Sequence, residues 1–138
     1  PAARERAQAS AARDSIELRG FVPEAEIETV WNRASVLAMP STEEGFGLVF
    51  VEAMRRAVPI LTSTQDAGAE VGVDGVTGFA VDLHRPAHLV ERLIEILGDA
   101  HLAAGLGANG RERWHEHFRY SAFRSRFLPH LWAFLASP

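Results

Sequence analysis

Short apolar runs alternate with longer amphipathic segments along this chain, and this alternation constrains its fold more than any other feature. The runs are SVLAMP at 35–40, VPILTS at 58–63 and FAVD at 79–82. Short, continuous runs of this kind are typical of strands that are buried on both faces. Residues 23–34 and 85–99 instead carry apolar side chains at helical spacing. Strands that alternate with helices predict an α/β fold with a parallel sheet.

The N-terminal part predicts two more elements. Residues 1–14 are alanine-rich with scattered charges, which indicates a helix with one small-residue face. Residues 15–22, SIELRGFV, alternate apolar and polar side chains as a strand does, and Gly20 and Pro23 would end that strand.

The C-terminal part predicts helices. Residues 100–118 favour a helix with a break near Gly107 to Gly110, and residues 121–136 favour a helix kinked at Pro129. The last helix carries an aromatic stripe, which consists of Phe123, Phe127, Leu131 and Phe134. Such a stripe usually packs inside the protein, here against the chain's own sheet, although it could also bind a partner or a membrane interface.

Composition narrows the class of protein. The 138 residues suffice for one domain, with 47% apolar and 23% charged residues as in globular proteins. A net charge of −4 argues against bulk binding to nucleic acid. Without cysteine, a signal peptide or a long apolar run, we expect a cytoplasmic protein, with a peripheral place at the inner membrane left open. The first residue is proline rather than methionine, which suggests an excised piece of a longer protein.

The segment STEEGFGLVFVEAM, at 41–54, carries the strongest chemical signal. Gly45 and Gly47 stand just before a predicted helix that runs to about Arg56, where free backbone amides and the helix dipole favour an anion such as a diphosphate. Glu44 in the loop and Glu52 in the helix add two carboxylates, each able to accept two hydrogen bonds from the hydroxyls of a sugar or ribose. The segment therefore predicts a nucleotide-sugar site.

A simpler interpretation of these carboxylates remains open on the pattern alone. Glu52 could be a surface residue that pairs with Arg55 or Arg56 at helical spacing. Glu43 and Glu44 could be ordinary acidic residues near a helix start, where the dipole favours them.

The histidines suggest no metal site. They are His84 and His88, His115 and His117, and the isolated His101 and His130. Pro86 interrupts the first pair, the second pair points to different sides of a helix, and no third ligand is evident. We expect histidines that are solvated or that cap backbone groups, and no metal.

Several segments together resemble the retaining glycosyltransferases of family 4, also called group 1, which have the GT-B fold. Glu44 and Glu52 match that family's E-x7-E signature, and the flanking segments at 17–41, 58–81 and 105–123 resemble its strands, loops and closing helix region. The resemblance runs from about Ser15 to the end of the chain. It implies a Rossmann-like parallel sheet with flanking helices, in one partial C-terminal, donor-binding domain over residues 1–138.

The resemblance also implies roles for single residues. Glu44 would contact the transferred sugar as the catalytic carboxylate, and Glu52 would hold the ribose hydroxyls. The loop around Phe21 and Val22 would hold the base. The diphosphate and sugar would meet the backbone of Gly45, Phe46, Gly47, Leu48 and Val49. The implied reaction is retaining hexose transfer from a nucleoside diphosphate sugar, with no cofactor and no obligatory metal.

The sequence departs from the family pattern in two respects. Ala57 stands where the family usually has glycine at a helix end. The first two strand–helix units of the domain are also missing, together with the N-terminal acceptor domain and the cations that neutralise the leaving diphosphate. Residues 1–14 would be a helix from the missing half. We expect the strand at 15–22 to pair directly with the strand at 35–40, or a separate chain to supply the missing part.

The missing parts of the domain determine which activity we expect of this chain. The isolated chain is expected to be inactive, and the alternative is a non-catalytic nucleotide-binding or interaction module that another chain completes. In the family the last helix crosses to the N-terminal domain. Without that domain, the aromatic helix at 118–138 is expected to be partly exposed and to drive self-association through residues 120–135.

Overall fold

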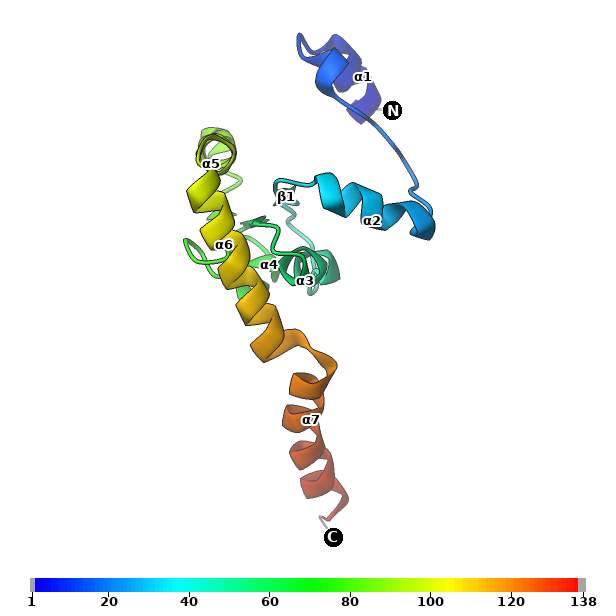
Figure 1. Cartoon of the computed structure of the whole chain (residues 1–138), viewed down its shortest axis with the longest axis vertical. Helices are drawn as coiled ribbons and strands as arrows, with labels where there is room; N and C mark the ends of the chain where they lie inside the picture. The colour runs from blue at the N-terminus through cyan, green and yellow to red at the C-terminus, as the bar shows by residue number, and fades with distance from the viewer. Residues whose placement is uncertain (1, 137–138) are drawn as a thin grey trace. The chain divides into compact units, whose positions relative to one another are not determined.

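The computed structural model describes residues 2–136, which form two compact units that divide after Asn32. Figure 1 labels the helices α1 to α7 and the strand β1.

The first unit consists of helices and an extended connection. It contains α1 (Ala2–Ala9), the 3₁₀ turn η1 (Arg13–Ser15) and α2 (Glu24–Arg33). The predicted helix at 1–14 therefore ends earlier than expected, while α2 agrees with the prediction. The apolar face predicted for α2 is only partly shielded from solvent, since Ile27, Val30 and Trp31 are half-buried and none is fully buried.

The predicted strand at 15–22 is wrong. Residues 16–22 form neither a strand nor a helix, and Ile16 and Leu18 are exposed. Arg19 instead forms ion pairs with Glu17 at 3.1 Å and Glu26 at 3.3 Å. Period-two alternation yields a strand only where a neighbouring strand accepts its backbone hydrogen bonds, and the expected direct pairing with the strand at 35–40 does not form.

The second unit contains a parallel three-stranded sheet, which confirms the predicted α/β class. Its strands are β1 (Leu37–Ala38), β2 (Ile60–Ser63) and β3 (Gly78–Val81), in the order β1-β2-β3. The central strand β2 is wholly buried, as predicted. The expected burial of β1 on both faces is wrong, because β1 lies at the sheet edge, with Leu37 half-buried and Ala38 exposed.

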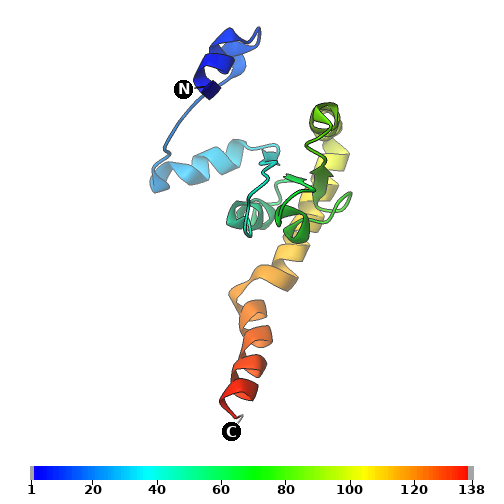
Figure 2. The same cartoon turned by 180° about the vertical axis from the view of Figure 1, so that it is seen from behind.

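Four helices accompany the sheet, namely α3 (Leu48–Arg55), α4 (Gly68–Val71), α5 (Pro86–Gly98) and α6 (Ala100–Arg113). Both views show α3 and α6 beside the small sheet (Figures 1 and 2). The helix α6 contacts α3, α5 and β3. The largest fully buried apolar side chains are Phe50, Met54, Ile60, Leu61, Ile96 and Val81.

The break predicted near Gly107 to Gly110 is wrong, since α6 is continuous through both glycines. A Cβ atom on Gly107 would lie 2.1 Å from the carbonyl oxygen of Ala57, and one on Gly110 would lie 3.2 Å from the Met54 side chain. The two glycines therefore allow α6 to approach α3 and the residue that follows it.

Beyond α6 the chain makes a π-helical turn, η2 (Trp114–Phe118), and continues as α7 (Tyr120–Leu135), which contains Pro129. No residue of α7 is buried, and Phe123, Phe127 and Phe134 are exposed. The expected packing of the aromatic stripe against the sheet is therefore wrong for the described residues, because α7 packs mainly against η2. No helix among residues 2–136 is long and apolar enough to cross a membrane.

Candidate functional site

Two loops meet at the carboxyl ends of β1 and β2. The loop at 41–47 follows β1, and the segment that leads into α4 follows β2. The Ala67 amide donates to the Glu44 carbonyl oxygen at 3.3 Å, which ties the two loops together. Ligands of parallel sheets bind beyond this edge.

The glycine at the start of α3 has a clear structural reason. Gly47 has φ 78 and ψ 60, in the left-handed region, and a Cβ there would lie 2.3 Å from the buried Phe50 ring. The φ angle of Gly45 is not positive, and a Cβ there would meet open space. The expected conformational need for glycine therefore applies to Gly47 alone, while Gly45 leaves room above the backbone.

The first amides of α3 are available to a ligand. The Phe50 amide donates to the Gly47 carbonyl oxygen at 2.9 Å, whereas no acceptor for the Leu48 and Val49 amides occurs among residues 2–136. Unpaired amides at a helix N-terminus favour an anion.

Glu44 already occupies part of this position. Its Oε1 accepts hydrogen bonds from the Gly47 amide at 2.9 Å and the Phe46 amide at 3.3 Å. The carboxylate thus orders its own loop, and its Oε2 forms no hydrogen bond or ion pair with any residue from 2 to 136. A charged ligand at these amides would have to share or displace the Glu44 oxygen.

Glu52 lies in the second turn of α3 and is exposed. Its carboxylate forms no hydrogen bond or ion pair among residues 2–136, although its carbonyl oxygen accepts from Arg56 at 3.1 Å. The Arg55 guanidinium lies 5.9 Å from the centre of the Trp114 ring. The carboxylate of Glu52 is thus available to a ligand.

The predicted residues line two cavities rather than one. Gly45 and Phe46 line a cavity of about 270 Å³ together with Glu70, Val71, Ala67, Arg113, His117, Phe118 and Arg126. Glu52 lines another, of about 470 Å³, with Val51, Arg55, Trp114, Phe118, Arg119, Tyr120 and Ser121. Phe118 lines both cavities.

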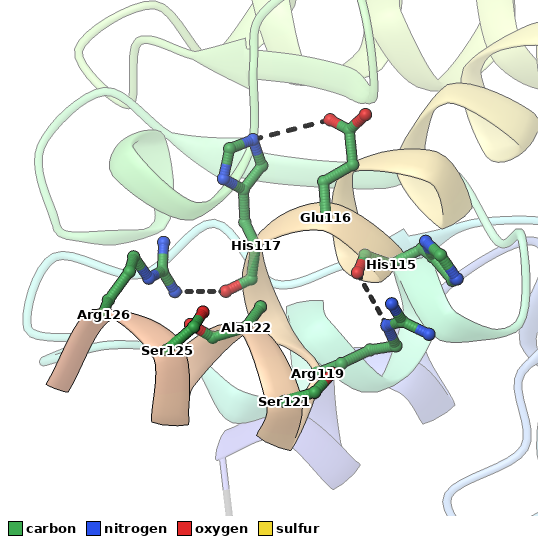
Figure 3. A pocket seen from close by; sticks show the side chains of 8 residues that line it. All are labelled: His115, Glu116, His117, Arg119, Ser121, Ala122, Ser125 and Arg126. Atoms are coloured by element: carbon green, nitrogen blue, oxygen red, sulfur yellow. Dashed lines mark hydrogen bonds and ion pairs between the residues drawn. The ribbon is translucent and has the colours of Figure 1, made fainter. Parts of the chain in front are cut away.

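A third cavity, of about 530 Å³, opens at the corner between η2 and α7 (Figure 3). Arg119, which precedes α7, and Arg126 of α7 reach back to the carbonyl oxygens of η2. Arg119 Nε donates to the His115 carbonyl oxygen at 2.8 Å, and Arg126 donates to that of His117 (Figure 3). These contacts hold the corner.

The residues expected at the base lie in the first unit. Phe21 is 90% exposed and Val22 is half-buried. Both belong to the extended connection between η1 and α2, so their place in a site stays a prediction.

Sequence reasoning missed a hydrogen-bonded link between the ends of β2 and β3. Gln65 donates to Asp82 Oδ1 at 2.8 Å and accepts from the Leu83 amide at 3.2 Å. The pKa of Asp82 is lowered, chiefly by the hydrogen bond from the His84 amide and further by Gln65. Nothing in the pattern of these polar residues marked them beforehand.

The histidines were considered above as possible metal ligands. Among residues 2–136 no three histidine, aspartate or glutamate side chains gather as they would around a metal ion. His88 instead accepts the Asp82 amide at 3.3 Å, which is the capping role expected of some histidines.

Comparison with known proteins identifies relatives. The profile of the family described as glycosyl transferases group 1 matches residues 2–113. An uncharacterized glycosyltransferase of Methanocaldococcus jannaschii is 33% identical over 97 residues, which cover 70% of this chain and 28% of that protein. The chain thus spans less than a third of that relative's length.

Solved structures agree on the fold. HepE of Anabaena, in complex with UDP, matches with a TM-score of 0.85 at 20% identity, over 95% of this chain and 36% of that one. The C-terminal domain of a glycosyl transferase group 1 family protein from Francisella tularensis matches with a TM-score of 0.76 at 21% identity, over 85% of this chain and 60% of that one.

Proposed function

Because the chain belongs to the group 1 glycosyltransferases, we propose that it holds part of a donor site for retaining transfer of a hexose from a nucleoside diphosphate sugar. Its three parallel strands and flanking helices match the C-terminal domain of GT-B enzymes, as the resemblance implied. The proposal names the donor class and leaves the acceptor open.

The observation that carries the proposal is the pair of unpaired amides at Leu48 and Val49 beside the free carboxylate of Glu52. In this proposal the amides bind the diphosphate, and Glu52, one turn further along α3, binds the vicinal hydroxyls of the ribose. The UDP bound by HepE, a protein of the same fold, supports this choice of ligand.

Glu44 would act on the sugar. When a diphosphate takes the amides of Phe46 and Gly47, the Glu44 carboxylate is released toward the donor sugar, where its charge stabilises the positive character that develops at the anomeric carbon. No step in this scheme needs a metal, since backbone amides supply the positive partner for the anion.

The proposal extends to the rest of the protein. Residues 1–138 would be one partial donor domain, with Phe21 and Val22 at the base. A missing N-terminal acceptor domain or a partner chain would supply the cations that assist the leaving group, so the isolated chain would bind donor without transferring sugar. A cytoplasmic location belongs to the same proposal.

A second candidate is a non-catalytic nucleotide-binding module. It is favoured by Glu44, whose carboxylate is turned toward its own loop amides rather than outward. Both candidates bind a nucleotide. Sugar transfer by the chain combined with an acceptor domain would be expected only of the first candidate.

Isothermal titration with UDP, ADP and GDP tests the site. We expect at least one diphosphate to bind, and Glu52→Ala to weaken it about 10-fold or more, because two hydrogen bonds to a charged group are lost. Glu91→Ala, at an exposed glutamate of α5, is the matched control and should leave the Kd unchanged.

Three results would contradict the proposal. The first is the absence of diphosphate binding, and the second is equal affinity of the Glu52→Ala and Glu91→Ala variants. The third is a Kd that rises on addition of EDTA, since it would place a metal in the site. Detectable transfer from UDP-glucose by the isolated chain would overturn the claim of inactivity.

A further inference from the structure

An aromatic contact joins the glycine loop to the corner at the end of α6. The rings of Phe46 and Phe118 meet edge to face, with centroids 6.1 Å apart and planes at 70°. Phe46 is otherwise largely open to solvent, with 47% of its surface exposed. Its backbone amide is one of the two that Glu44 accepts. The contact therefore touches the loop at the point where the candidate ligand amides lie.

Arg113, the last residue of α6, lies behind that contact. Its guanidinium carbon lies 5.6 Å from the centre of the Phe118 ring, on the ring's face. The same group donates from Nε to the Val71 carbonyl oxygen at 2.8 Å and from Nη2 to that of Glu70 at 3.1 Å. One half-buried guanidinium thus binds the end of α4 and supports the aromatic ring at once.

Its two contacts lead to the same loop by different routes. Through Phe118, Arg113 reaches the side chain of Phe46. Through α4 it reaches Ala67, the residue before that helix, whose amide holds the Glu44 carbonyl oxygen at 3.3 Å. The loop at 44–47 is therefore fastened at both ends by elements that share Arg113.

The corner that carries Phe118 is itself fixed. Arg119 and Arg126 bind two carbonyl oxygens within η2, those of His115 and His117 (Figure 3). A π-helical turn leaves carbonyl groups without their usual α-helical partners, and these arginines supply donors for two of them. The ring of Phe118 is thus presented to the loop from a constrained backbone.

We propose that Arg113 and Phe118 are positioning residues that hold the backbone of the 44–47 loop in its ordered conformation, in which a diphosphate needs to displace only the Glu44 side chain. Both line the cavity of Gly45 and Phe46, and in this proposal they act on the loop through Phe46 and α4. The effect on loop order stands on its own, whereas the effect on binding rests on the proposed function.

The ligand-free chain, labelled with ¹⁵N, gives the direct test. In Arg113→Gln and Phe118→Leu, we expect the Phe46 and Gly47 amide resonances to move and their hydrogen exchange to quicken about 10-fold, because the loop opens locally. The matched controls are Arg111→Gln, on the exposed side of α6, and Phe123→Leu, in the stripe of α7. Both controls should leave the loop amides in place.

Two further readouts separate positioning from general destabilisation. The Leu61 amide in the central strand should exchange at its original rate, and Phe118→Tyr, which keeps the ring edge, should restore the slow loop exchange. If Arg113→Gln unfolds the chain, the loop exchange rates of Phe118→Leu and Phe118→Tyr are sufficient to test the proposal. Loop amides that behave alike in Phe118→Leu, Phe123→Leu and the parent chain would overturn the proposal.

Titration with UDP on the same samples links the loop to binding. We expect Phe118→Leu to weaken UDP about 5- to 10-fold, with recovery in Phe118→Tyr, because the ligand must first order the loop. A parent chain that binds none of UDP, ADP and GDP but shows the expected loop response would refute the proposed function and leave the positioning role intact. If Phe118→Leu loosens the loop but binds UDP as tightly as the parent chain does, the role of these residues in binding is refuted.

Discussion

Ala57 adopts a backbone conformation that alanine seldom occupies. Its φ of 56 is the only positive value at a non-glycine position among the described residues. The conformation closes α3, because the Ala57 amide bonds to the Met54 carbonyl oxygen and the Val58 amide bonds to that of Ala53, each at 3.0 Å. This is the Schellman arrangement, which usually carries glycine. The departure noticed in the sequence is therefore a strained helix end.

Ala57→Gly should stabilise the chain by about 0.5–1 kcal/mol, since relief of the left-handed strain exceeds the extra entropy of an unfolded glycine. Urea denaturation followed by circular dichroism measures the change. Ala108→Gly, at an exposed position inside α6, is the control and should destabilise by about 1 kcal/mol. Equal destabilisation by both substitutions would show that Ala57 carries no strain.

At the same scale, the sequence predicted which residues could bind a donor but not how they are turned. The spacing of Glu44 and Glu52, with glycine between them, is visible in the letters alone. The bonds from Glu44 to its own loop depend on the left-handed turn at Gly47, and the contact of Phe118 with Phe46 depends on where α6 ends. Neither follows from local pattern.

At the scale of elements, the approach of α6 to α3 depends on a missing side chain. Gly107 lies against the Ala57 carbonyl group, which is backbone and cannot swing away as a side chain would. Gly105, two residues earlier in the same helix, faces open space. The two glycines therefore differ only in what a methyl group would meet.

Gly107→Ala should destabilise the chain by about 1–3 kcal/mol, because the new Cβ forces the helices apart despite a better helix propensity. Gly105→Ala should instead stabilise it by up to about 1 kcal/mol through propensity alone. Thermal or urea unfolding of the two variants tests this. If Gly107→Ala and Gly105→Ala have similar free energies of unfolding, α6 can shift away from Ala57 without loss of stability.

Periodicity predicted most elements correctly. It failed where the structure of a segment depends on contacts with another part of the chain. The α2, α3 and α5 helices and the buried β2 strand show their pattern in a short window of sequence. Residues 15–22 show an equally clear alternation but form no strand, because a strand exists only with a neighbour. The sequence predicts a helix break at the glycines of α6, since it does not reveal the close contact that requires them.

At the scale of the whole molecule, α7 adds aromatic surface that nothing among residues 2–136 buries. Phe123 and Phe127 stack on each other with centroids 5.4 Å apart, yet both rings remain exposed. Exposed patches of this kind mark interaction sites or drive association.

The isolated chain should therefore self-associate as its concentration rises, which sedimentation velocity can follow. Replacing both rings, by Phe123→Ser with Phe127→Ser, should shift the onset of association to about 10-fold higher concentration. The double variant exposes less apolar area, so association removes less of it from water. Arg124→Ser, between the two rings in sequence, is the control. A parent chain that stays monomeric across the whole range would refute this expectation.

The π-helical turn at η2 has a consequence for how the chain tolerates changes in length. Each residue of a helix turns the next by about 100° and advances it by about 1.5 Å, so removing one residue between Arg113 and Tyr120 would rotate everything beyond it. The aromatic row of α7 would then face another direction, and Arg126 would lose the carbonyl group it binds. The number of residues in this corner, as much as their identity, encodes the direction in which the end of the chain presents its surface.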